Sequence, residues 1–194
     1  MKAIQLDYKS KFVADMNRTL ELICADPGAH QQACTILRRY DGVASIGSVE
    51  TTVFQKLFLQ LMQMPLEEVG QGIKQMSQHW ANPIFLKRAL EGAFDGSNAS
   101  CTTKMDAAQC RSFAVRATHT VAEQVDLDSP PAWGEDVHLA KFTHVILNGS
   151  AARCLGNRQV QHGGDDYTVN VGYVGFKIFP PCARTSSSSA TTVR

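Results

Sequence analysis

Residues 48–64 read SVETTVFQKLFLQLMQM, and this stretch decides the fold class. Its apolar residues recur at steps of three and four positions, which places them on one face of a helix: Val49, Val53, Phe54, Leu57, Phe58, Leu61 and Met64. This spacing predicts an amphipathic helix that packs against a core. Ser48 is the expected N-cap, because its hydroxyl can accept from a free N–H of the first turn. Pro65 is expected to end the helix.

The same helical spacing recurs on both sides of this stretch. It predicts helices over residues 10–25, 29–40, 66–96 (in several pieces) and 107–125. Asp26-Pro27-Gly28 and Asp41-Gly42 are expected to end the first two, because Pro and Gly interrupt helices. These two helices should form an antiparallel pair. The first two thirds of the chain are therefore predicted to be helical.

The residue composition changes after Pro130-Pro131. Residues 137–147 and 167–179 are rich in β-branched and aromatic residues and alternate in part, which predicts strands. Residues 176–194 end in a polar, low-complexity run and are expected to be a divergent, disordered tail. The sequence thus predicts a helix-rich α+β body over residues 1–175.

Composition excludes several classes of function. A chain of 194 residues is one domain, or a large part of one. Its 19 Lys and Arg balance 18 Asp and Glu without a long run of either sign, so neither nucleic acid nor an anionic membrane is an expected partner. No stretch is apolar enough for a membrane span, and the first residues, MKAIQLDYKSK, lack the apolar segment of a signal peptide.

The stretch AWGEDVHLAKFTH (132–144) resembles a metal or acid/base site at first sight. His138 and His144 would lie about 20 Å apart on a strand and on different faces of a helix, so they cannot share one ion. Asp136 could orient His138 on a strand face, but a nucleophile or metal would have to come from elsewhere. A structural role is therefore favoured.

Residues 162–166, HGGDD, are a second polar cluster. They lack the lysine and following helix of a phosphate loop and the ligand spacing of an EF-hand. A tight turn that leads into a strand from Tyr167 to Val171 is the favoured interpretation.

The six cysteines leave two interpretations open. Cys24 with Cys34 and Cys101 with Cys110 have spacings that suit local disulfides, which would imply an oxidising compartment. In a reducing compartment all six would be free thiols. A helical Cys/His module that binds zinc is an alternative function, although no spacing matches a known zinc pattern. A stand-alone cysteine hydrolase is a third, less favoured alternative.

Four segments, in this order, resemble the late part of the penicillin acylase family, especially its acyl-homoserine lactone acylase branch. They are ACTILRRYDG (33–42), the loop from Cys101 to Cys110, PAWGEDVHLAKFTH (131–144) and HGGDDYTVNVG (162–172). The sequence departs from the family pattern at Tyr40, where the family usually has Trp, and at Asp166, where it usually has Gly. The spacing from Trp133-Gly134 to His138 is one residue longer than in the family, and after Gly172 the resemblance fades.

The resemblance implies a C-terminal fragment, from the β-subunit region, of an N-terminal-nucleophile hydrolase with an αββα fold. Such enzymes hydrolyse linear amide C–N bonds in penicillin-like or N-acyl-homoserine lactone-like substrates, in antibiotic biosynthesis or quorum quenching. The family's catalytic serine, oxyanion-hole groups and calcium ligands lie upstream of the matched segments. The resemblance therefore places no catalytic, cofactor-binding or metal residue in this chain.

The same resemblance sets the remaining expectations. The chain alone should be inactive, and its partners should be the remainder of the acylase chain and, in the full enzyme, a small amide substrate. Calcium is expected in the full enzyme but no cofactor in this chain. The parent enzyme is expected to be periplasmic or secreted.

Overall fold

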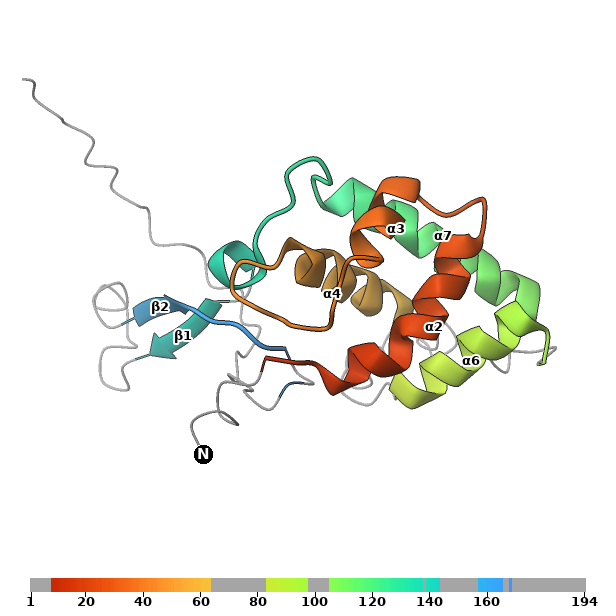
Figure 1. Cartoon of the computed structure of the whole chain (residues 1–194), viewed down its shortest axis with the longest axis horizontal. Coiled ribbons are helices and arrows are strands. Elements are labelled where there is room, and N and C mark those ends of the chain that lie inside the picture. The colour runs from red at the N-terminus through yellow and green to blue at the C-terminus, as the bar shows by residue number, and fades with distance from the viewer. Residues whose placement is uncertain are drawn as a thin grey trace, which may run out of the picture.

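The computed structural model describes residues 8–63, 83–97, 105–137, 139–143, 157–165 and 168. Its elements are α2 (Lys11–Ala25), α3 (Gln31–Leu37), α4 (Val49–Leu61), α6 (Pro83–Asp95), α7 (Ala107–Gln124), the π-helical turn η2 (Trp133–Val137), β1 (Leu139–Thr143) and β2 (Asn157–Gln161). Helices dominate, as predicted, and the two strands lie beside them (Figure 1). No helix in the described part is long and apolar enough to cross a membrane.

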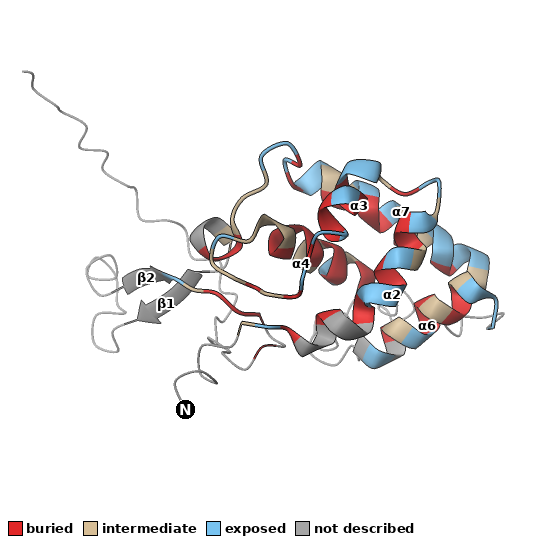
Figure 2. Cartoon of the chain, viewed as in Figure 1, coloured by how far each residue is buried: buried red, intermediate tan, exposed pale blue. Residues whose placement is uncertain are grey.

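The helices pack around one apolar core, and α7 contacts α2, α3, α4 and α6. The faces that the helices turn toward one another are buried, whereas their outer faces are exposed (Figure 2). The largest fully buried apolar side chains come from α2, α4, α6 and α7: Phe54, Met16, Ile23, Leu57, Leu61, Leu86, Leu90, Val13, Val53 and Val121. The apolar stripe predicted for residues 48–64 therefore forms the centre of the core, through α4.

Local signals explain where the helices begin and end. The Ser48 hydroxyl accepts from the Thr51 N–H at 3.1 Å, which confirms the predicted N-cap of α4. Asp106 and Gln109 form a capping box at the start of α7, with bonds of 2.8 and 2.9 Å. Gly96 follows α6 with φ of +78°, a conformation that glycine adopts without strain.

The second helix is shorter than the predicted range of 29–40. It ends at Leu37, and the bonds Arg39 N–H to Ile36 O and Tyr40 N–H to Leu37 O close tighter turns after it. Tyr40 still reaches the core, with 7% of its surface exposed, because these turns point it inward. The apolar pattern thus identified the buried residues correctly but not the end of the helix.

A disulfide joins α2 to α3. Cys24 and Cys34 are bonded with a Cα–Cα distance of 5.5 Å, and both are buried. The Arg38 guanidinium donates to the Cys24 carbonyl at 2.7 Å and ties the end of α3 to the end of α2. The prediction of a local bridge is confirmed for this pair.

The strands are confirmed in part. β1 pairs with β2 antiparallel, with Leu139 opposite Gln161 and Thr143 opposite Asn157. β1 lies within the predicted strand of 137–147, but Val137 belongs to η2 instead, and 144–147 lie outside the described residues. β2 was not predicted, because its sequence NRQVQ has a single apolar residue and no strand signature. The tail 176–194 also lies outside the described residues.

Candidate functional site

Four segments that are distant in sequence meet between the helices and the strands. They are residues 8–10, the loop 42–48, the pair Trp133-Gly134 and the segment 162–165, and we call them together the motif junction. Three of them belong to, or directly follow, the segments that carry the sequence resemblance. The junction lies where the chain passes from the helices into η2 and β1 and where β2 returns (Figure 1). It therefore holds the end of the β1–β2 pair at which β1 begins and β2 ends, where Leu139 lies opposite Gln161.

Ala44 is at the centre of the junction. Its N–H donates to the Tyr8 carbonyl at 2.9 Å, and its own carbonyl accepts from the Gly164 N–H at 2.6 Å. Two residues earlier in the loop, the Gly42 carbonyl accepts from the Ser10 N–H at 2.8 Å. Ala44 is fully buried, so these bonds satisfy backbone groups that water does not reach. The loop 42–48 thereby joins the first and the last described segments of the chain.

Trp133 and Gly134 bind the other end of this loop. The Trp133 N–H donates to the Ser48 carbonyl at 3.0 Å, and the Gly134 N–H donates to the Ile46 carbonyl at 2.7 Å. The indole N–H of Trp133 is buried and donates to the Gly164 carbonyl at 2.7 Å. A tryptophan suits this position because it fills buried space and satisfies a buried carbonyl at its polar edge.

The glycines of the junction are required by close packing. A Cβ at Gly134 would contact the His162 carbonyl oxygen and lie 2.8 Å from Ile46 Cα. A Cβ at Gly163 would lie 2.9 Å from the Ala44 carbonyl oxygen. Gly164 has φ of +90°, which disfavours other residues. Backbone packing and conformation thus explain the glycines of Trp133-Gly134 (the WG motif) and of His162-Gly163-Gly164 (the HGG motif).

Asp165 fixes the segment 162–165 to helix α4. Its side chain is buried, with 4% of the residue exposed, and its Oδ2 accepts from Gln55 Nε2 at 2.8 Å. The Thr168 hydroxyl donates to the Asp165 carbonyl at 2.9 Å, and the Asp165 N–H donates to the same hydroxyl at 3.0 Å. These bonds form a turn, as predicted for the HGGDD cluster.

The turn extends further than predicted. Thr168 lies in a bend and hydrogen-bonds to Asp165, so the prediction that a strand begins at Tyr167 is wrong at Thr168. The physical reason is the threonine hydroxyl, which bonds to the nearby backbone and competes with a strand ladder. The rest of the predicted strand, like Asp166, lies outside the described residues.

Tyr40 adds a buried hydroxyl near this carboxylate. Burial raises the pKa of Tyr40 strongly, the nearby Thr51 hydroxyl acts in the opposite direction, and the charges of Asp165 and Asp41 raise it further. The hydroxyls of Tyr40 and Ser10 are buried and have no hydrogen-bond partner among the described residues. Tyr40 is therefore a neutral phenol at physiological pH.

The histidines and acids singled out from AWGEDVHLAKFTH are not brought together in the described part. His138 and His144 lie outside the described residues, and Asp136 is described only through its backbone in η2. His162 is half-buried, and its backbone N–H donates to the Gly134 carbonyl at 3.3 Å. The structural role favoured for this stretch is carried by Trp133 and Gly134.

The cysteines that the structure describes are oxidised. Cys24 and Cys34 pair with each other, and Cys110 is also disulfide-bonded, so the free-thiol alternative is wrong for these three. Cys101 lies outside the described residues, and its pairing with Cys110 remains a prediction. Within the described ranges no group of three or more His, Cys, Asp or Glu could hold a metal ion. A zinc module would have to use other residues.

Two features of the junction had no signal in the sequence. Gln55 reaches Asp165 across 110 positions, and nothing about a glutamine in an amphipathic helix marks it as such a partner. The loop carbonyls of Ala44 and Ile46 accept bonds from the motif glycines, but any residue supplies a carbonyl. Only the glycines and the tryptophan were visible as a pattern.

The chain matches the model of a known protein family. The family model described as penicillin amidase matches residues 1–193. No curated protein matches the chain.

Proposed function

The chain belongs to the penicillin amidase family of amide hydrolases, and we propose that it forms a structural, C-terminal part of an N-terminal-nucleophile hydrolase of this family. The family match over residues 1–193 is the observation that carries the proposal. The enzyme would hydrolyse a linear amide C–N bond in a penicillin-like or N-acyl-homoserine lactone-like substrate. The chain supplies no catalytic residue and is inactive by itself.

The motif junction supports a structural role. Three of its residues have structural roles. The Trp133 indole donates to the Gly164 carbonyl, Gly134 packs closely against the His162 backbone, and Asp165 accepts from Gln55 of α4. The junction holds the Leu139–Gln161 end of the β1–β2 pair against the helices. In the full enzyme the catalytic groups would come from the remainder of the acylase, and firm support for them matters because small displacements of reacting groups cost large factors in rate.

In the full enzyme the nucleophile would be a serine whose own α-amine acts as the base. A serine hydroxyl is a weak nucleophile until a base of suitable pKa lies within reach. Calcium would be held by the remainder of the enzyme and not by this chain. The partners of the chain are then the remainder of the acylase and, through it, the amide substrate, and the disulfides suit a periplasmic or secreted enzyme.

The test compares the chain alone with the chain joined to its upstream coding sequence. We expect the purified chain to release no amine from penicillin G or from an N-acyl-homoserine lactone. The joined protein should hydrolyse one of the two and lose this activity when the serine at its cleavable Gly-Ser junction is replaced by alanine. Normal turnover by the chain alone would overturn the proposal, as would an inactive, well-folded joined protein.

A further inference from the structure

A small cavity lies between α2 and the end of α3, beside Tyr40. It has a volume of about 120 Å³ and is lined by Asn17, Leu20, Glu21, Cys24, Leu37, Arg38 and Tyr40. Apolar cavities of about 150 Å³ are large enough for a ligand the size of benzene. This cavity is separate from the motif junction, because its lining residues Leu20, Glu21 and Arg38 take part in none of the junction's hydrogen bonds.

The floor and the rim of the cavity differ in chemistry. Leu20, Cys24, Leu37 and Tyr40 are buried and form an apolar floor beside the disulfide. Asn17, Glu21 and Arg38 are exposed and form the rim. The floor offers contact to a short apolar group, and the rim offers a carboxylate, a guanidinium and an amide.

The two rim charges have opposite sign and do not neutralise each other. Arg38 is held over the cavity by its 2.7 Å bond to the Cys24 carbonyl, which uses one of its five N–H donors. In the described part of the chain Glu21 and Arg38 form no ion pair with each other. A ligand that carries a carboxylate and an ammonium group could pair with both.

We infer that this cavity binds a small zwitterion, an α-amino acid with a short apolar side chain. The ligand carboxylate pairs with Arg38, its ammonium group pairs with Glu21, and its side chain contacts Leu20 and Leu37. Asn17 can bond to either polar group of the ligand. The inference does not depend on the proposed amide hydrolysis, since it requires no catalytic residue.

The test measures binding of L-valine to the full chain by calorimetry and by the shift in thermal midpoint. We expect saturable one-to-one binding in the millimolar range. Isovalerate, which lacks the ammonium group, and isobutylamine, which lacks the carboxylate, should bind about tenfold more weakly or not at all, because each loses one charged contact.

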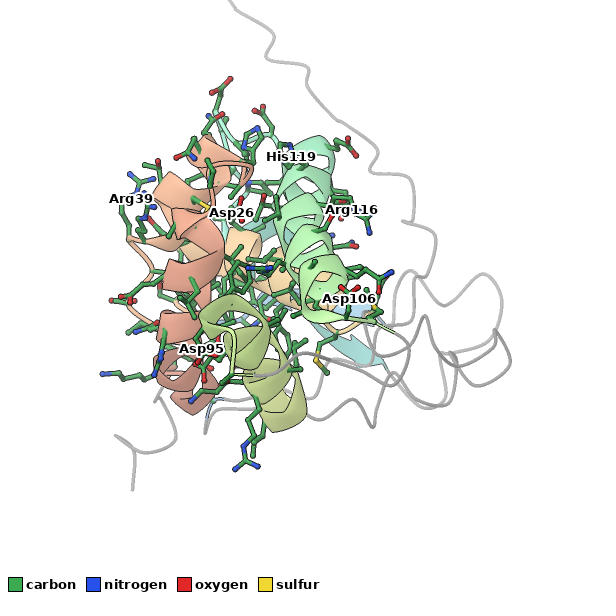
Figure 3. The ribbon with its side chains drawn as sticks, turned by 90° about the vertical axis from the view of Figure 1, so that its right-hand side faces the viewer. Asp26, Arg39, Asp95, Asp106, Arg116 and His119 are labelled. Atoms are coloured by element: carbon green, nitrogen blue, oxygen red, sulfur yellow. A yellow bond between two sulfur atoms is a disulfide. The ribbon has the colours of Figure 1, made fainter. Side chains whose placement is uncertain are left out.

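Matched variants locate the site. Glu21→Gln and Arg38→Gln should each weaken valine binding about tenfold or more. Arg39→Gln is the control, because Arg39 neighbours Arg38 in sequence but does not line the cavity and extends away from the helices (Figure 3). Leu20→Phe should fill the cavity and remove binding, and circular dichroism verifies that each variant is folded.

Three outcomes would overturn the inference. They are the absence of saturable binding up to about 50 mM valine, binding of isovalerate or isobutylamine as tight as that of valine, and equal effects of Arg38→Gln and Arg39→Gln. If Arg38→Gln does not fold, the result for Glu21→Gln is decisive by itself, because Glu21 is exposed and its side chain makes no hydrogen bond or ion pair among the described residues.

Discussion

The helical body and the motif junction are held together in different ways. In the body, α2, α3, α4, α6 and α7 bury apolar side chains against one another. In the junction, four distant segments meet through backbone hydrogen bonds, two close-packed glycines and one buried indole. The body depends on side-chain volume, whereas the junction depends on backbone hydrogen bonds and on two positions where a side chain does not fit.

This difference explains which parts of the sequence are diagnostic of the family. Many apolar residues satisfy a core position, provided that the volume and the helical spacing are kept. At Gly134 and Gly163 no other residue fits, because a Cβ would meet backbone atoms that cannot move aside. The glycines of the Trp133-Gly134 and 162–164 motifs are therefore fixed by the junction, whereas α4 in the body contributes only a periodic pattern.

Truncation in the body should have the largest effect. Phe54 is 1% exposed and contacts the rings of Tyr40 and Phe58 at centroid distances of 5.1 and 6.1 Å. Phe54→Ala should lower the free energy of unfolding by about 4 kcal/mol, measured by urea denaturation. Leu59→Ala on the same helix is the control, since Leu59 is 49% exposed and its loss should cost less than about 1 kcal/mol. Similar losses for both variants would contradict the assignment of the core.

Addition of one methyl group in the junction should have the second-largest effect on the free energy of unfolding. Gly134→Ala should cost about 3 kcal/mol, because its Cβ meets His162 and Ile46 backbone atoms. Gly47→Ala in the same loop is the matched control, because a Cβ there has no neighbour within 4 Å and its free energy should change little. Urea denaturation of both variants measures the difference, and a tolerated Gly134→Ala would refute the packing argument.

Removal of the α2–α3 disulfide should cost somewhat less. The double variant Cys24→Ala, Cys34→Ala should lose about 2 to 3 kcal/mol, because a bridge across a short loop restricts the unfolded chain only moderately. The loss should appear as a lower thermal midpoint in calorimetry. An unchanged midpoint would mean that Arg38 and the core hold α2 and α3 together without the bridge.

Tyr40, which packs in the body near Asp165 of the junction, should show the smallest effect and the opposite sign. Tyr40→Phe removes a buried hydroxyl without a partner in the described structure and should stabilise the protein by about 1 kcal/mol. Because burial raises the pKa of Tyr40 in the folded protein, the tyrosine of the unfolded chain ionises first as the pH rises past about 10, and the folded state loses stability above that pH. Denaturation between pH 9 and 11 should therefore affect wild type more than the variant. Equal alkaline sensitivity would contradict this.

The sequence predicted the body better than the junction. The spacing around Phe54 and Leu57 identified α4, and Ser48 marked its start, because both signals are local. The WG and HGG motifs were recognised as structural, but not what they bind: Ala44 and Ile46 contribute only carbonyls, and Gln55 has no distinguishing neighbours. β2 was missed because its strand character comes from pairing with β1 rather than from its own polar residues.

Hydrogen exchange of backbone amides tests most directly whether the junction is an integral part of the fold. The Gly134 and Gly164 amides donate to loop carbonyls at 2.7 and 2.6 Å, and the Leu57 and Phe58 amides lie in α4 at the centre of the core. We predict that all four exchange with the same free energy of opening, equal to that of global unfolding. Opening of the Gly134 and Gly164 amides at a free energy lower by about 2 kcal/mol or more would show that the junction opens independently, and would contradict its role as the clamp of the β1–β2 pair.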